Sequence, residues 1–175
     1  MGEARLARLL EGWRGAWLLP FIHALSELGE ASASSLARRL STRSVVAKTA
    51  LYALRRAGLV ERVAEGRYRL AEGADEEYRG LLRLVYSDGR RFLWYTGAHY
   101  IYARVSRSRV SAWTLPAYLV ERVVEEYRRS PARPSELGAR LGLHGRTVSR
   151  ALLAARLAGL LEESIEDDGG LGDGA

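Results

Sequence analysis

Basic side chains mixed with small hydroxyl side chains gather at two places in the chain, about one hundred residues apart. An arginine fork can grip guanine O6 and N7, or a phosphate, through two hydrogen bonds, and threonine and serine can contact bases or phosphates. The first group has four positive residues and no acid between residues 41 and 56. The first group is Thr42, Arg43, Ser44, Lys48, Tyr52, Arg55 and Arg56, and the second is His144, Arg146, Thr147, Ser149 and Arg150. Both groups are candidate DNA-binding surfaces.

The overall charge agrees with an anionic partner. The 175 residues include 27 basic and 21 acidic side chains, which give a net charge of +6 and a pI of about 10.0. This balance favours nucleic acid over a membrane surface as the partner.

Catalytic and metal-binding signatures are missing from the sequence. The chain has no cysteine, so it has no disulfide, no thiolate metal site and no cysteine nucleophile. His23, His99 and His144 are far apart, and none has zinc-ligand spacing to another histidine. Neither a nucleophile elbow nor a phosphate-binding glycine loop is found in the right context. We therefore expect neither an enzyme nor a cofactor.

The N-terminal segment has the outline of a secretory signal, with arginines before an apolar stretch. Glu11, His23 and Glu27 interrupt that stretch, however. No segment approaches the roughly 18 apolar residues that a membrane span requires. The sequence predicts a cytoplasmic protein without a membrane partner.

The chain contains an internal repeat. At an offset of 101 residues, residues 36–40 match residues 137–141, and residues 57–61, which include Gly58, match residues 158–162, which include Gly159. Further upstream the offset becomes 102, and the matched apolar residues are Leu18, Phe21, Ile22 and Leu25 against Val120, Val123, Val124 and Tyr127. The sequence predicts two copies of one structural unit.

Each copy has the apolar spacing of three helices. The expected helices span residues 16–28, 34–40 and 44–57 in copy one, and run from a cap at Thr114 to about Ser130, then 135–141 and 146–158, in copy two. After copy one, alternating apolar residues around the turn 64–66 predict a β-hairpin over residues 59–70. Its residues Arg62, Arg67 and Arg69 are further candidates for DNA contact. The matching stretch of copy two is acidic, so we expect that hairpin to be reduced or absent.

The run Arg146-Thr147-Val148-Ser149-Arg150-Ala151-Leu152, followed by Ala158-Gly159-Leu160-Leu161, resembles the winged helix-turn-helix family of transcriptional regulators. This resemblance implies a mainly α fold with a small β-wing, in which tandem winged helix-turn-helix units are joined by an aromatic-rich central segment. It also implies that a third helix enters the major groove. Copy one departs from the pattern at Val45-Val46, which leaves open that copy one docks on protein instead.

The central segment has no counterpart elsewhere in the chain. Trp94, Ala98, Ile101 and Val105 have helical spacing, whereas Asp88-Gly89 among aromatic residues favours a hairpin. We expect helices and keep the hairpin as the alternative. Seven aromatic residues between positions 86 and 113 suggest a homodimer interface or a packing hub.

The sequence thus predicts five parts. They are an N-terminal extension (1–15), a first unit (16–72), the central segment (73–113), a second unit (114–164) and a disordered acidic, glycine-rich tail (165–175). The expected function is sequence-specific binding of double-stranded DNA by a homodimeric transcriptional regulator. The alternatives are a non-catalytic protein-interaction module of a chromosome or transcription complex, and a replication initiator.

Overall fold

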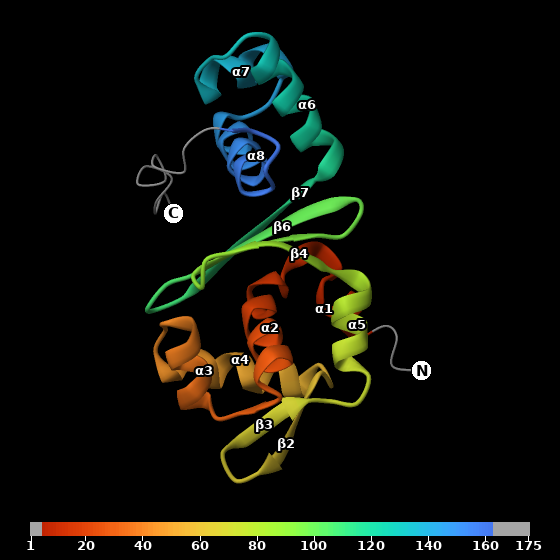
Figure 1. The fold of residues 1–175 in the computed structure, drawn as a ribbon, viewed down its shortest axis with the longest axis vertical. Coiled ribbons are helices and arrows are strands. Elements are labelled where there is room, and N and C mark those ends of the chain that lie inside the picture. The colour runs from red at the N-terminus through yellow and green to blue at the C-terminus, as the bar shows by residue number, and fades with distance from the viewer. Residues whose placement is uncertain (1–4, 163–175) are drawn as a thin grey trace. The chain divides into compact units, whose positions relative to one another are not determined.

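The computed structural model describes residues 5–162, which contain eight α-helices and two antiparallel sheets (Figure 1). The chain divides into two compact units. Within the described residues, the first unit takes in the chain up to Thr96 together with Ile101–Thr114, and the second takes in Gly97–Tyr100 together with the chain from Leu115.

The first unit begins with helices. They are α1 (Arg5–Leu9), two short 3₁₀ turns (Glu11–Trp13 and Ala16–Leu18), α2 (Leu19–Leu28), α3 (Ala33–Leu40) and α4 (Ser44–Arg56). Ser32 and Ser35 start α3 by a reciprocal capping box, in which each side chain bonds the other residue's backbone N–H. α4 buries a stripe that consists of Ala47, Ala50, Leu51 and Leu54. The predicted helices over 34–40 and 44–57 are confirmed to within one residue at each end.

A three-stranded sheet completes the helical part of this unit. Its strands are β1 (Glu30–Ala31), β2 (Val60–Ala64) and β3 (Arg67–Leu70), in the order β1-β3-β2. Val60 pairs with Leu70 and Arg62 with Tyr68, which confirms the predicted hairpin over residues 59–70. β1, which adds Ala31 opposite Tyr68, has no signal in the sequence because it is only two residues long.

The central segment forms one short helix and then a four-stranded sheet. These elements are α5 (Ala74–Leu81), β4 (Arg83–Ser87), β5 (Arg91–Tyr95), β6 (His99–Val105) and β7 (Val110–Pro116). Asp88 shapes the first turn, because its Oδ1 accepts from the backbone N–H groups of Arg90 and Arg91 at 3.0 and 2.7 Å. Gly89 follows it with a φ of 89°, which favours glycine. The helix expected through Trp94 and Ile101 is therefore wrong, and the hairpin alternative is correct.

The predicted fold class is wrong as well. The molecule is a mixed α and β fold and not a mainly α tandem winged helix-turn-helix. The reason is that the sheet of the central segment supplies core. Phe92, Trp94 and Ile101 are buried in the same apolar cluster as Phe21 and Ile22 of α2. Instead of joining two helical units, most of this segment belongs to the first one.

The second unit contains α6 (Ala117–Arg129), α7 (Pro134–Leu141) and α8 (Gly145–Leu157). The bounds of α7 and α8 lie 101 residues after those of α3 and α4, so the internal repeat is confirmed for these helices. α6 begins after Pro116, because Thr114, expected as its cap, lies in β7. The hairpin expected to be absent after residue 162 and the tail at 165–175 lie outside the described residues.

The two copies differ at one close contact. Gly138 of α7 occupies the position of Ala37 in α3, and a Cβ on Gly138 would lie 2.4 Å from the Leu143 carbonyl oxygen. We expect Gly138→Ala to lower the free energy of unfolding by about 1–3 kcal/mol, because backbone has to move. Gly80→Ala in α5 is the control, since nothing lies within 4 Å of its added Cβ.

Gly80→Ala is expected to raise stability by about 0.5–1 kcal/mol by reducing the freedom of the unfolded chain. Urea titration followed by far-ultraviolet circular dichroism compares the two variants. Equal unfolding midpoints would contradict the tight contact at Gly138.

Candidate nucleic-acid interface

One side of α4 is exposed along its whole length. The outward residues, which we call the α4 face, are Ser44, Val45, Lys48, Thr49, Tyr52, Arg55 and Arg56. Val45 is 61% exposed and Tyr52 is 64% exposed, which is unusual for large apolar side chains. The apolar stripe of the helix already faces the core, so the α4 face is left available to a partner.

The positive charges of the α4 face are not neutralised by acidic side chains of the described residues. Within residues 5–162, Lys48, Arg55 and Arg56 make no ion pair with a carboxylate, and neither does Arg43 just before the helix. The guanidinium of Arg56 lies 5.9 Å from the centre of the Tyr52 ring instead. Several other arginines of the first unit do have acidic partners, and these pairs are Arg5–Glu77, Arg39–Glu27, Arg69–Glu61, Arg79–Asp75 and Arg91–Asp88.

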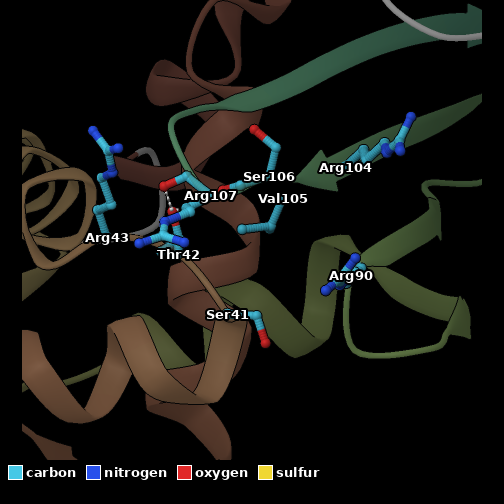
Figure 2. A pocket seen from close by; sticks show the side chains of 8 residues that line it. All are labelled: Ser41, Thr42, Arg43, Arg90, Arg104, Val105, Ser106 and Arg107. Carbon is cyan, nitrogen blue, oxygen red and sulfur yellow. Dashed lines mark hydrogen bonds between the residues drawn. The ribbon is translucent and has the colours of Figure 1, made fainter.

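A pocket of about 510 Å³ adjoins the start of α4 (Figure 2). We call it the arginine pocket, and it is lined by Ser41, Thr42, Arg43, Arg90, Arg104, Val105, Ser106 and Arg107. These residues come from the α3–α4 turn, the β4–β5 turn, and the end of β6 with the turn that follows. Figure 2 shows Arg43 and Arg107 on one side and Arg90 and Arg104 on the other.

Backbone hydrogen bonds hold these segments together. The Arg43 N–H donates to the Arg107 carbonyl at 3.0 Å, and the Val105 N–H donates to the Arg90 carbonyl at 2.8 Å. The Thr42 hydroxyl donates to the carbonyls of Ser106 at 2.8 Å and Arg107 at 3.1 Å. The sequence predicted that Thr42 contacts DNA. In the structure its hydroxyl instead donates to these two carbonyls and so attaches the turn between α3 and α4 to the turn after β6.

No acidic side chain within residues 5–162 neutralises the arginine pocket. In the part of the chain that the structure describes, the guanidinium groups of its four arginines have no carboxylate partner, and no acid is among the lining residues. The nearby acid, Asp88, is held by the Arg91 side chain at 2.8 Å. Burial acts to raise the pKa of Asp88, but hydrogen bonds from Arg91 and Arg90 outweigh it and lower that pKa. The Asp88 carboxylate is therefore paired with the Arg91 side chain and makes no ion pair with the Arg90 guanidinium.

Arg90, Arg104 and Arg107 were not predicted from the sequence to bind a ligand. Only the pairing of β4 to β7 brings them near Arg43. A signal for two of them was present, because Arg104, Arg107 and Arg109 lie within six residues and no acid separates them.

The predicted contacts on the β2–β3 hairpin are partly neutralised. Arg69 Nε lies 2.6 Å from Glu61 Oε1, and Arg67 lies 3.5 Å from Glu30. Arg62 donates to the carbonyl of Ala64 in its own hairpin at 3.3 Å. This hairpin therefore offers less free charge to a phosphate than the α4 face does.

The candidates in the second unit lie at the start of α8. His144 and Arg146 are exposed, whereas Thr147, Ser149 and Arg150 are only partly exposed. Burial, and then the charge of Arg146, lower the pKa of Arg150. Arg150 is only partly exposed, whereas Lys48, Arg55 and Arg56 of α4 are exposed, so α8 is a weaker candidate surface than α4.

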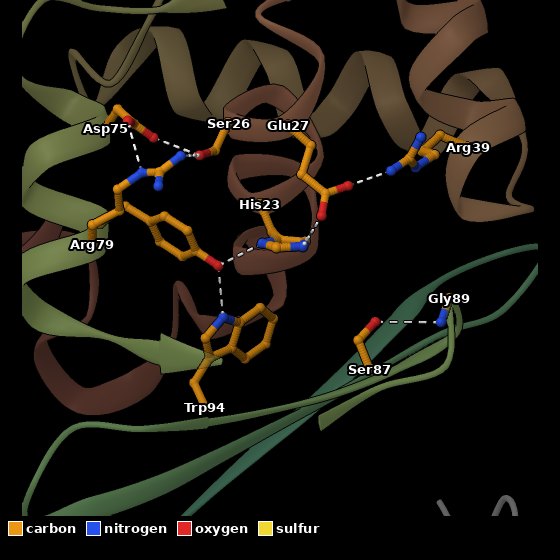
Figure 3. Close-up of polar contacts among 10 residues, drawn as sticks. His23, Ser26, Glu27, Arg39, Asp75, Arg79, Ser87, Gly89 and Trp94 are labelled. Carbon is orange, nitrogen blue, oxygen red and sulfur yellow. Dashed lines mark hydrogen bonds and ion pairs between the residues drawn. The ribbon is translucent and has the colours of Figure 1, made fainter. Parts of the chain in front are cut away.

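A partly buried chain of hydrogen-bonded side chains links the helices of the first unit to its larger sheet (Figure 3). Trp94 Nε1 donates to the Tyr78 hydroxyl at 2.8 Å, and that hydroxyl lies 2.8 Å from His23 Nδ1. The other ring nitrogen, His23 Nε2, lies 2.9 Å from Glu27. A neutral His23 with its proton on Nε2 satisfies every member, since Tyr78 then donates to Nδ1. This chain supports the core and offers no reactive group to a substrate.

The pH dependence of folding stability tests whether Tyr78 is held in these hydrogen bonds. Burial raises the pKa of Tyr78 to about 12 from 10.0. The unfolded chain therefore loses this proton from pH 10 upward while the folded protein keeps it until about pH 12, so folding stability falls as pH rises through that interval. At pH 11 the expected loss is about 1.4 kcal/mol. Urea unfolding at pH 8 and pH 11 measures it, and Tyr78→Phe should show a loss smaller by that amount. An equal loss in both proteins would contradict the assignment.

Two further classes of site receive no support within residues 5–162. No group of three or more histidine, aspartate or glutamate side chains could hold a metal ion. No helix there is both long enough and apolar enough to cross a membrane. Comparison with protein-family models, with curated proteins and with solved structures gives no match.

Proposed function

We propose that this protein binds double-stranded DNA through the α4 face of its first unit. The observation that carries the proposal is uncompensated positive charge on an exposed helix face that also presents Val45 and Tyr52. Solvated surface arginines are common, but here they lie next to exposed apolar side chains and lack the acidic partners found elsewhere in the unit.

The dimensions of α4 suit the major groove. Thirteen residues give a helix about 20 Å long, and the major groove of B-DNA, about 12 Å wide, admits such a helix. In this arrangement Ser44, Val45 and Lys48 near its start would face base edges, with the Val45 methyls suited to thymine methyl groups. Arg55 and Arg56 near its end would contact phosphates.

We further propose that the protein acts in the cytoplasm as a transcriptional regulator. Sequence-specific binding in the cytoplasm without a catalytic step is typical of a transcriptional regulator. A homodimer would place two α4 faces on the two halves of a symmetric site. Light scattering at micromolar concentration tests the dimer, and a monomeric mass would contradict it.

A salt titration tests the function. Fluorescence anisotropy measures binding to random duplex DNA at about 50 and 200 mM salt. Two neutralised phosphates, one for each of Arg55 and Arg56, predict a log–log slope of about −2. A lack of binding at the lower salt concentration would contradict the proposal.

The second candidate is docking of the α4 face on another protein. The exposure of Val45 and Tyr52 favours it, because large apolar side chains and arginine are enriched in protein interfaces. It becomes the leading interpretation if duplex DNA does not bind.

A further inference from the structure

The arginine pocket is a concave site, and none of its lining residues belongs to the α4 face. It lies at the junction of three segments of the first unit, and the backbone bonds between Arg43 and Arg107 and between Val105 and Arg90 close it. The connections between these segments are made by main-chain atoms and the Thr42 hydroxyl, so the arginine side chains are not needed for them. Four like charges beside one pocket disfavour folding slightly, and an anionic ligand would relieve that repulsion.

The chemistry of the lining selects phosphate. Arginine guanidinium groups bind phosphate oxygens with two parallel hydrogen bonds. The Ser106 hydroxyl is used within its own turn, where it donates to the Arg109 carbonyl at 2.9 Å and accepts from the Arg109 N–H at 3.2 Å, so the arginines carry the recognition. Val105 is the one apolar residue among the eight that line the pocket, and four of the other seven are arginines. A carboxylate would satisfy one arginine, whereas four arginines on two sides of the pocket match several phosphates (Figure 2).

The start of α4 adds to the attraction for an anion. Ser41, Thr42 and Arg43 line the pocket and lead directly into the helix. No side chain caps this helix end, so N–H groups of its first turn remain available. The positive end of the helix dipole therefore lies at the pocket rim, where it stabilises negative charge.

The volume indicates the size of the ligand. About 510 Å³ is within the range of pockets that hold small molecules. A single phosphate would fill only a small part of this volume. The pocket has room for a chain of linked phosphates.

We propose that the arginine pocket is a binding site for an oligophosphate, in which Arg90, Arg104 and Arg107 hold successive phosphate groups at the positive end of α4. The phosphates can belong to a soluble phosphorylated molecule or to consecutive positions of a nucleic-acid strand. The site does not depend on the α4 face, so the two proposals can fail separately.

Titration calorimetry with inorganic tripolyphosphate tests the site. The pocket variant is Arg90→Gln/Arg104→Gln/Arg107→Gln. The control variant is Arg8→Gln/Arg14→Gln/Arg122→Gln, which removes the same charge from exposed arginines elsewhere. Wild type should bind one equivalent, the pocket variant should bind at least about tenfold more weakly, and the control should stay within about twofold. Equal weakening in the two variants would overturn the proposal, because it would mean general charge attraction.

A lysine variant keeps the test valid if the glutamine variant does not fold. Replacing the same three arginines by lysine keeps the charge and removes the fork. Intermediate weakening of tripolyphosphate binding is expected, since lysine binds phosphate as a point charge. An affinity for tripolyphosphate in the lysine variant equal to that of wild type would overturn the site, because the guanidinium forks would then contribute nothing to binding.

Duplex DNA as a second probe identifies the source of the phosphates. Competition between tripolyphosphate and duplex, with weaker duplex binding by the pocket variant, indicates strand phosphates. Tripolyphosphate binding that the pocket variant loses while duplex binding is unchanged, or never present, indicates a soluble ligand. If wild type binds no tripolyphosphate and the pocket variant binds duplex as wild type does, the proposal is wrong.

Discussion

The variant Lys48→Gln/Arg55→Gln/Arg56→Gln is expected to bind duplex DNA roughly 10²–10³-fold more weakly than wild type at about 100 mM salt, a loss of about 3–4 kcal/mol. The three side chains are exposed and lack carboxylate partners within residues 5–162, so their removal costs the fold no ion pair. Fluorescence anisotropy gives the affinity, and the salt dependence should become shallower by about 0.9 for each lost phosphate contact.

The matched control is Arg8→Gln/Arg14→Gln/Arg122→Gln. These arginines are also exposed, and their loss changes the net charge equally. Long-range attraction alone would weaken both variants alike, whereas contact through the α4 face predicts a much larger effect in the first. Similar affinities for the two variants would therefore remove α4 as the contact surface.

A substitution in α8 tests whether the second copy also contacts DNA. Arg146→Gln/Arg150→Gln changes two of the positions that the sequence predicted to contact DNA in the second copy. Because Arg150 is only partly exposed, we expect less loss of DNA affinity than from the α4 variant. The internal repeat thus preserves the helices, while the exposure of the basic side chains differs between the copies.

The helices of both copies could be predicted because the signals were local. Apolar residues at helical spacing define the inward faces, and Gly58 and Gly159 mark the ends at equivalent positions, with φ of 77° in both. The turn between α3 and α4 shows the same match, since Ser41 and Gly142 both have left-handed backbone conformations, with φ of 54° and 69°. Such features depend on neighbouring residues, so one sequence is enough to find them.

The central segment could not be predicted in the same way. Trp94 and Ile101 have helical spacing by coincidence, because they belong to two different strands of one sheet. The turn formed by Asp88-Gly89 and the strand preference of aromatic residues were the more reliable signals. The arginine pocket depends on the same sheet, so its residues could not be grouped from the sequence.

Trp94→Ala is expected to lower the free energy of unfolding of the first unit by about 3–5 kcal/mol. The side chain is fully buried, stacks on Phe92 with 5.5 Å between ring centres, and donates to the Tyr78 hydroxyl. Its removal leaves a cavity and takes the Trp94 donor from the polar chain around Tyr78. Because domains are stable by only about 5–15 kcal/mol, urea unfolding followed by circular dichroism should show a large shift of this unit.

Two further variants serve as controls for Trp94→Ala. Trp94→Phe keeps an aromatic ring but no donor, so a loss of about 1–3 kcal/mol is expected. Tyr118→Ala removes an aromatic side chain that is 68% exposed on α6, and should change stability by less than about 0.5 kcal/mol. If the central segment were only a connection between helical units, Trp94→Ala would resemble Tyr118→Ala. A large difference between them means that the sheet is part of the core that supports α4 and the arginine pocket.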